Sequence, residues 1–201
     1  MTFTIKPIAE LNSDEIDKLA DLHISVMHTL LSDLGKPIVL RYYQLAHKHP
    51  DVIGLCALSD DGDILGWATG SANPADVNKQ LRLPLPWFFS QLLRLVFSHP
   101  GIILDLIGSL ISTSKANQIK ADQLELTYIG IANDAQGRGM GKLLLNAFLE
   151  AAHQANYKSI ALSVETENMA AISLYSHSGF AITQTFREGR FERHRMEIFL
   201  S

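Results

Sequence analysis

The stretch AQGRGMGKLLLNAFLEAA, residues Ala135 to Ala152, places three glycines within five positions and then continues as an apolar pattern of helical period. Glycine is a poor helix former, so its use at the start of a helix needs a reason. Helix N-termini carry unpaired N–H groups and a partial positive charge, and a glycine-rich entry lets these donors approach a phosphate group. The stretch lacks the Lys-Ser or Lys-Thr pair of a nucleoside-triphosphate loop. On these residues alone, phosphate binding and a tight strand-to-helix turn stay open as alternatives.

The segments on both sides of this stretch predict a mixed α/β (α+β) fold. Alternation and apolar runs predict strands over residues 3–7, 52–58, 64–71, 124–132, 159–165, 180–186 and 194–200. Capping residues and helical periodicity predict helices over residues 12–34, 37–47, 139–156 and 169–178. The acidic turn Ser59–Asp63 is typical of an antiparallel hairpin, whereas strands joined through a helix return in parallel. We therefore expect a central mixed, largely antiparallel sheet flanked by helices.

Length and composition favour one domain, residues 1–201, with 47% hydrophobic and 19% charged residues. A formal net charge of −4 gives no reason to expect nucleic acid as a partner. The single cysteine, Cys56, fits a reducing compartment and is interpreted as a small buried hydrophobic residue. The sequence begins without a secretory signal pattern and contains no uninterrupted apolar run long enough to span a membrane, so we expect a cytoplasmic protein.

Residues 73–122 form an apolar insertion before the strand that leads to the glycines. Two helices are predicted within it, over Leu83–Ser98 and Pro100–Ser112. Trp87, Phe88, Phe89 and the leucines after them suggest a lid over an acceptor pocket or a dimer face, because such an apolar surface rarely remains bare. A plain added layer of the core is weighed equally.

Two segments together resemble the GNAT superfamily of acyl-CoA-dependent N-acyltransferases. The first, LELTYIGIANDAQGRGMGKLLLNAFLEAA, contains the family's signature as Gln136, Gly139 and Gly141. The second, NMAAISLYSHSGF, is similar to the family's later landmark of Asn, a helix ending in Leu-Tyr, and Gly-Phe opening a strand. The resemblance covers roughly residues 124–180 and implies a GNAT-like fold, acetyl-CoA as cosubstrate, and transfer of an acetyl group to an amine.

The resemblance also implies where coenzyme A would bind. Pantetheine would pair with the strand ending in YIGI, using Ile129, Gly130 and Ile131. Asn168 would contact the cofactor, cap the helix that follows it, or do both. The pyrophosphate would lie on backbone amides of the glycine stretch, namely Gln136, Gly137, Arg138, Gly139, Met140, Gly141 and Lys142.

Acetylation of an amine requires removal of a proton, because a free alkylamine is almost wholly protonated at neutral pH. Glu125 is the first candidate for the general base, since it is an acid on an apolar strand and stands where the histone-acetylating branch of the family places its catalytic glutamate. An ordinary outward-facing carboxylate, a water molecule and Glu165 remain alternatives. Tyr175 occupies the family's general-acid position, where a phenol can protonate the departing thiolate; its alternative is a core aromatic residue.

The acceptor is the least determined part of the reaction. Because of the apolar insertion, a small-molecule amine or amino sugar is favoured over a protein or peptide amine, and a noncatalytic acyl-CoA-binding module is the rival. The histidines show no metal-ligand spacing, so no metal is expected and structural roles are assigned to them. Arg187, Arg190, Arg193 and Arg195 are interpreted as charges of a solvated hairpin, or as a cluster that orients an anionic acceptor. A homodimer is left open.

Overall fold

A computed structural model of the chain describes residues 2–98, 120, 122–188 and 191–200. It contains a seven-stranded sheet in the order β1-β2-β3-β4-β5-β7-β6, in which β4 and β5 are parallel and the other described neighbours antiparallel. The predicted mixed, largely antiparallel sheet is confirmed. The strands are β1 (Phe3–Pro7), β2 (Val52–Ser59), β3 (Ile64–Ser71), β4 (Gln123–Ile131), β5 (Ser159–Glu165), β6 (Ala181–Glu188) and β7 (Phe191–Phe199).

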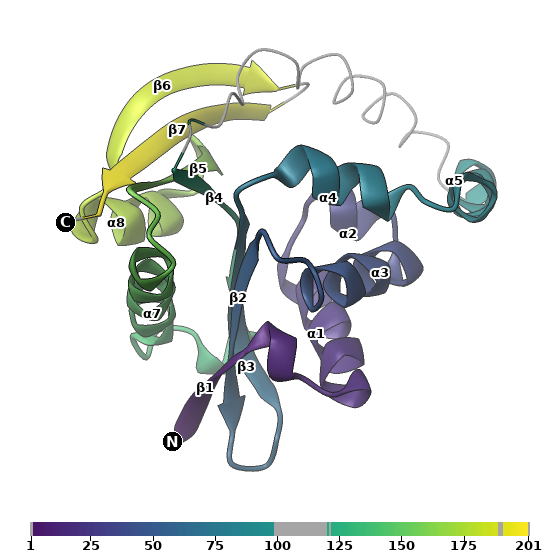
Figure 1. Cartoon of the computed structure of the whole chain (residues 1–201), viewed down its shortest axis with the longest axis horizontal. Helices are drawn as coiled ribbons and strands as arrows, with labels where there is room; N and C mark the ends of the chain where they lie inside the picture. Colours follow the sequence, from purple (N-terminus) through teal and green to yellow (C-terminus); the bar gives the residue numbers. More distant parts are fainter. Residues whose placement is uncertain (1, 99–119, 121, 189–190, 201) are drawn as a thin grey trace.

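Helices cover both faces of the sheet (Figure 1). The N-terminal helices, including α1 and α3, pack on one face, and α7 and α8 lie on the other. Because β3 lies between these two layers, all eight of its residues are buried. The helices are α1 (Ser13–Val26), α2 (Leu30–Asp33), α3 (Lys36–Ala46), α4 (Pro74–Leu81), α5 (Leu85–Ser98), α7 (Met140–Gln154) and α8 (Met169–His177).

The core beneath the N-terminal helices contains a cluster of aromatic side chains. Trp67 and Tyr43 are fully buried there, and the ring of His23 lies 5.5 Å and 5.7 Å from theirs. Nδ1 of His23 is 2.7 Å from the hydroxyl of Tyr43, so the buried imidazole has a polar partner. Cys56 is buried in the same cluster, in agreement with its interpretation as a small hydrophobic residue.

The first predicted helix ends earlier than expected. Its start is confirmed, because Asn12 and Glu15 form a capping box with bonds of 2.9 Å and 2.7 Å. The helix stops at Val26, since Met27 adopts an extended conformation, and the chain re-enters a helix at Leu30. The hydroxyl of Thr29 accepts a bond from the amide of Ser32, which is the kind of local bond that starts a new helix.

The insertion begins with a helix that we did not predict. Asn73 caps α4 by accepting from the amide of Asp76, and Pro74 occupies the first turn. The next helix, α5, confirms the helix predicted over Leu83–Ser98. The second predicted helix of the insertion, Pro100–Ser112, lies outside the described residues.

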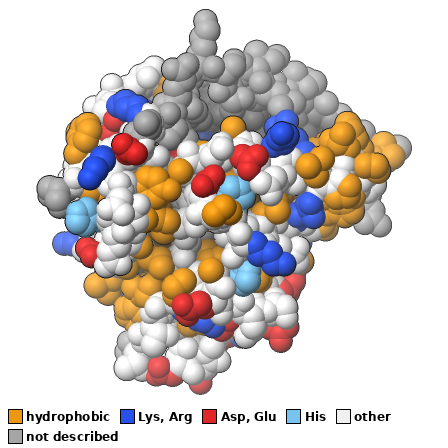
Figure 2. Space-filling view, in the orientation of Figure 1, with side chains coloured by type: hydrophobic (Ala, Val, Ile, Leu, Met, Phe, Trp, Pro, Cys, Tyr) orange, Lys and Arg blue, Asp and Glu red, His pale blue; other side chains and the backbone are white. Residues whose placement is uncertain are grey.

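One side of α5 belongs to the core and the other is exposed. Trp87, Phe88 and Leu92 pack against the cluster beneath the N-terminal helices. On the other side, Leu85, Phe89 and Leu93 are 51%, 62% and 58% exposed, and hydrophobic side chains gather over this part of the surface (Figure 2). The described part of the insertion therefore contributes side chains to the core on one side and presents an apolar stripe on the other. In the ranges that the structure describes, no helix has the length and apolar character needed to cross a membrane.

Candidate active site

Among the described strands, the parallel pair β4 and β5 separates after a short stretch of pairing. β4 and β5 pair at three positions, from Gln123 opposite Ser159 to Glu125 opposite Ala161. Beyond Glu125, β4 continues to Ile131 with β3 as its partner among the described strands. The register of β3 and β4 also shifts beside Thr127, where an extra residue in one strand increases the local twist. On the side of β5, residues 126–131 of β4 therefore have no strand partner among the described residues.

The glycine stretch lies at the far end of this edge. Gly137 and Gly139 have φ values of +74° and +78°, which residues with a side chain rarely adopt, and a Cβ at either residue would meet no atom within 4 Å. Glycine is thus required at residues 137 and 139 by the backbone conformation and not by lack of space for a side chain. Leu143 donates the first bond of α7 to the carbonyl of Gly139, so the amides of Met140, Gly141 and Lys142 precede that bond. The arrangement has the donors and the open surface expected of an anion site.

Gln136 fixes the loop to the strand. Its Nε2 donates to the carbonyl of Ile131 at 3.1 Å and to Oδ1 of Asn133 at 3.2 Å. The side chain of the signature glutamine therefore holds the loop against the end of β4.

Gly130 has a packing role that the sequence did not indicate. A Cβ on Gly130 would come within 2.5 Å of the indole ring of Trp67. Its neighbours Ile129 and Ile131 are half-buried and pack on the opposite face, against the cluster beneath α7. Glycine at residue 130 thus lets β4 pack closely against the buried ring of Trp67. This packing role is separate from the predicted contact of its backbone with a cofactor.

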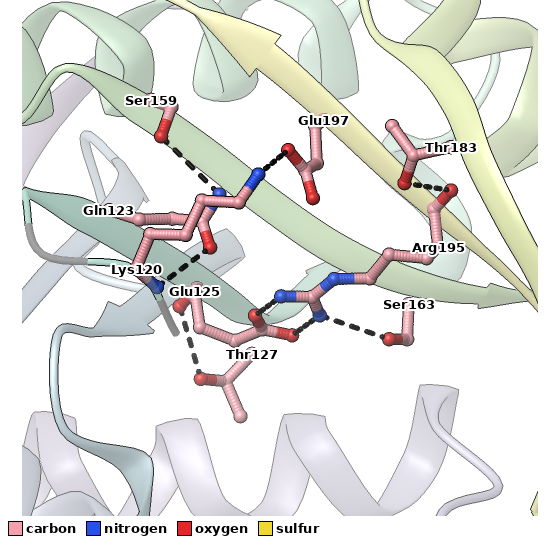
Figure 3. Close-up of polar contacts among 9 residues, drawn as sticks. All are labelled: Lys120, Gln123, Glu125, Thr127, Ser159, Ser163, Thr183, Arg195 and Glu197. Carbon is pink, nitrogen blue, oxygen red and sulfur yellow. Dashed lines mark hydrogen bonds and ion pairs between the residues drawn. The ribbon is translucent and has the colours of Figure 1, made fainter. Parts of the chain in front are cut away.

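Glu125 stands at the point where the two strands separate. It is 9% exposed, and its neighbours Leu124 and Leu126 belong to the cluster beneath α7. Since successive side chains of a strand alternate between faces, Glu125 points to the opposite face. Figure 3 shows Arg195 reaching from β7 to this carboxylate, with Nη1–Oε1 and Nη2–Oε2 distances of 2.5 Å each.

The pKa of Glu125 is subject to two opposing influences. Burial raises it above that of a free glutamate, and Glu197 adds to the increase, whereas the guanidinium of Arg195 opposes it by favouring the charged form. Arg195 is itself 5% exposed, so its interpretation as a charge of a solvated hairpin is wrong. It is buried because β7 is an inner strand of the sheet, between β5 and β6.

Other polar pairs continue along this face of the sheet. Lys120 lies 3.0 Å from Glu197, and Arg193 lies 3.7 Å from Glu165. The amide of Gln123 donates to Ser159. Glu165, the reserve candidate for the base, is at the end of β5, beyond the point of separation, and its side chain is 41% exposed.

Tyr175 and Asn168 belong to α8. Tyr175 is buried in the cluster beneath α7, and this burial raises the pKa of its phenol to about 12. Its ring is 5.8 Å from that of Phe180. Asn168 is the N-cap of the helix, because its Oδ1 accepts from the amide of Ala171 at 3.1 Å. The capping alternative for Asn168 is therefore confirmed, while its contact with a cofactor stays a prediction.

The structure brings the candidate residues to one strand and its two faces. Glu125 and residues 129–131 share β4, the glycine loop follows that strand, and Tyr175 packs in the cluster that contains Leu126. The residue that sequence reasoning missed is Arg195. The sequence showed only that Arg195 is a charged residue within a predicted strand, between His194 and Met196. Its partner, Glu125, is 70 residues away in the chain. Among the described residues, no group of three or more potential ligands could hold a metal ion.

Comparisons with known proteins indicate the family to which the chain is similar. The model of the acetyltransferase (GNAT) family matches residues 20–180. A mycothiol acetyltransferase of Mycobacteroides abscessus is 27% identical over 186 residues, which are 89% of this chain and 59% of that protein. A second one, from Renibacterium salmoninarum, is 44% identical over 57 residues, which are 28% of this chain and 17% of that protein. The chain thus spans less than two thirds of these curated relatives.

Solved structures share the fold. The ribosomal-protein-S18-alanine N-acetyltransferase of Escherichia coli superposes with a TM-score of 0.62 and 14% identity, over 100% of this chain and 95% of that one. A putative acetyltransferase of Salmonella typhimurium, solved with acetyl-CoA, superposes with a TM-score of 0.63 and 14% identity over the same shares. Since the family model matches well over half of the sequence, the chain belongs to the GNAT family of acetyltransferases.

Proposed function

We propose that this chain transfers an acetyl group from acetyl-CoA to the primary amine of a small polar acceptor, with both substrates bound together. The observation that carries the proposal is the edge of β4 from Glu125 to the glycine loop, which is unpaired among the described strands because β4 and β5 pair at only three positions. Such an edge accepts extended polar groups as an added strand does, and the amides at the start of α7 suit a pyrophosphate. The residues proposed to hold the cofactor are those named above: 129–131, 136–142 and Asn168.

In the proposed reaction, the neutral amine attacks the carbonyl carbon of the thioester. The surplus proton of the amine passes to the carboxylate of Glu125, the C–S bond breaks, and the departing thiolate takes a proton from Tyr175. Two features support these roles. Glu125 and Tyr175 lie on opposite faces of β4, so the amine and the thiol can be served from different sides. The pKa of about 12 keeps Tyr175 protonated and able to donate.

The proposed acceptor is an amine that carries hydroxyl or other polar groups, with amino sugars favoured. The polar character of the sheet face beside Glu125 supports this choice, since ion pairs of Lys120 with Glu197 and of Arg193 with Glu165 lie on it. The curated relatives that bear the name mycothiol acetyltransferase point to a small-molecule acceptor as well. This choice is tested by measuring the release of free thiol from acetyl-CoA with a series of amino sugars and, for comparison, with a series of peptides that have a free N-terminal amine. A higher kcat/KM for the peptides would refute it.

Cofactor binding is tested by calorimetric titration with acetyl-CoA. Gly139→Glu places a negative side chain where the pyrophosphate would lie, and we expect it to abolish binding. Gly62→Glu is a matched control, because Gly62 also has a φ of +78° and no atom within 4 Å of a Cβ, but lies in the turn between β2 and β3. Equal effects of the two substitutions, or no binding by the wild type, would refute the phosphate site.

Turnover separates the enzyme from a noncatalytic acyl-CoA-binding module. We expect wild-type protein to release thiol from acetyl-CoA when an accepted amine is present, and Glu125→Gln to lower kcat by about 100-fold or more. A protein that binds acetyl-CoA but releases no thiol with any amine of the screen would be the binding module instead.

Self-association of the chain is also proposed, with the outer stripe of α5 as the contact. Leu85, Phe89 and Leu93 form an exposed apolar row of helical spacing. We expect Phe89→Ser with Leu93→Ser to convert a dimer to a monomer in sedimentation velocity. A wild-type monomer at high concentration would refute this part of the proposal.

A further inference from the structure

Arg195 reaches its partner across an intervening strand. The sheet order places β5 between β4 and β7, so the guanidinium spans two strand spacings, or about 10 Å, to meet Glu125. Small residues on β5 make this path possible: Ala161 lies directly opposite Glu125, and Ser163 directly opposite Arg195. Nη1 of Arg195 also donates to Oγ of Ser163 at 3.3 Å, which fixes the side chain along its path.

The contact itself is restrictive. Nη1 of Arg195 donates a hydrogen bond to Oε1 of Glu125, and Nη2 lies 2.5 Å from Oε2 as an ion pair without hydrogen-bond alignment. The two contacts together set the orientation of the carboxylate as well as its distance. The two side chains are 6% and 12% exposed, so solvent screens the pair weakly. Because the guanidinium stays protonated at any ordinary pH, its charge is permanent.

Among the residues that the structure describes, the charged groups that act on Glu125 come from β7. Arg195 favours the carboxylate, and Glu197 disfavours it, but Glu197 is itself paired with Lys120 at 3.0 Å. From the helix layer, Tyr42 of α3 is in contact with Thr127, and burial raises the pKa of this tyrosine to about 12, so it adds no charge at neutral pH. Arg195 is thus the described cation that partly offsets the burial of Glu125, whose pKa stays above the ordinary value of a glutamate.

We infer that Arg195 is a positioning residue of this enzyme: it holds the Glu125 carboxylate charged and fixed where β4 and β5 separate, so that the incoming amine meets a preoriented base. The inference rests on the proposed function, in which Glu125 takes the proton of the amine. In this role Arg195 acts through Glu125. A buried carboxylate without this partner would take up a proton more readily and would lose its capacity to accept one from the amine.

The test compares the pH dependence of kcat/KM in three variants. Arg195→Met removes the cation and keeps much of the side-chain volume, and we expect the acidic limb of the profile to move up by one pH unit or more. Arg195→Lys retains a charge without the paired geometry, and should shift the limb less while still lowering kcat. Arg193→Met is the control, because Arg193 is two residues along the same strand face and pairs with Glu165; its limb should stay in place.

A second measurement does not depend on turnover. The carboxyl carbon of Glu125 can be titrated by NMR in protein labelled with ¹³C-glutamate, with the resonance identified by its loss in Glu125→Gln. We expect Arg195→Met to raise this titration midpoint by one unit or more. An unchanged midpoint, or a uniform loss of kcat/KM with no movement of the limb, would overturn the inference and leave Arg195 a structural residue. Absence of thiol release by the wild type would instead refute the proposed function.

Discussion

Trp67 of β3 and Gly130 of β4 lie opposite each other in the sheet, and a Cβ on residue 130 would lie 2.5 Å from the indole ring. The contact joins the aromatic core beneath the N-terminal helices to the strand that carries the candidate active site.

Gly130→Ala should therefore destabilise the protein. Overpacking of a filled core typically costs about 1–3 kcal/mol, because the ring or the strand must shift. Urea denaturation measures the loss. Gly141→Ala is the control, since a Cβ there would meet its nearest atom at 3.5 Å and the residue lies in α7, where alanine is the better helix former. Equal stability of wild type and Gly130→Ala would contradict the prediction.

Substitutions of Asn168 separate its two expected roles. Asn168→Ala removes the cap of α8 and should cost about 1 kcal/mol in unfolding free energy. Asn168→Asp keeps an acceptor for the amide of Ala171 and should restore most of this stability. If Asn168 also contacts the cofactor, the new negative charge should weaken acetyl-CoA binding in calorimetry. An unchanged Kd in the folded Asn168→Asp variant would limit the residue to capping.

Tyr175→Phe tests the proposed general acid. We expect kcat to fall about tenfold, a modest loss because a thiolate with a pKa near 8.5 can partly leave unaided. The pKa of Tyr175, raised to about 12 by burial, also predicts that its ionisation produces no basic limb below about pH 10. Tyr157→Phe, a tyrosine that follows α7, should leave kcat unchanged. Equal rates in wild type and Tyr175→Phe would assign Tyr175 to the core alone.

His23 should make the stability of the fold dependent on pH. Burial lowers its pKa to about 4 from an ordinary value of 6.5. The folded state therefore binds fewer protons than the unfolded state between these values, so the contribution of His23 is complete above pH 6.5 and is lost as the pH falls toward 4. Between pH 7 and pH 5 this loss amounts to about 2 kcal/mol.

Urea denaturation at the two pH values, for wild type and His23→Gln, measures the effect. Glutamine retains a polar partner for the hydroxyl of Tyr43 without a titratable group. The difference in stability between the two proteins should therefore shift against the wild type at pH 5. A difference that does not change with pH would show that the pKa of His23 is not lowered in the folded state.

Local signals predicted much of this fold. The capping box at Asn12, the acidic turn between β2 and β3, and the glycines before α7 each depend on residues within a few positions of one another. The break at Met27 was missed because the apolar pattern continues through it, and the cap at Thr29 was not recognised. The helix α4 was missed within a segment that was judged mainly by its apolar character.

The site was predicted less completely, for a physical reason. The family resemblance indicated Glu125, the glycine loop and Tyr175, which lie within one part of the chain. The partner of Glu125 depends on the strand order β4-β5-β7, which no pattern along the sequence specifies. In the sequence, Arg195 consequently looked like the other arginines of a charged hairpin. Its pairing with Glu125 becomes evident only from the position of β7 inside the sheet.

That strand order also constrains how the protein can fold. β7 follows β6 in the chain but lies between β5 and β6 in the sheet. The strand that pairs with β5 is therefore the last one to be synthesised. The simplest route is formation of the β6–β7 hairpin from local contacts, followed by docking of its β7 edge onto β5. In that single step the guanidinium arrives at the carboxylate on β4. Before that step, the Glu125 carboxylate would lack its arginine partner and would have to stay solvated. The sheet would then consist of two separate parts, β1 to β5 and the β6–β7 hairpin.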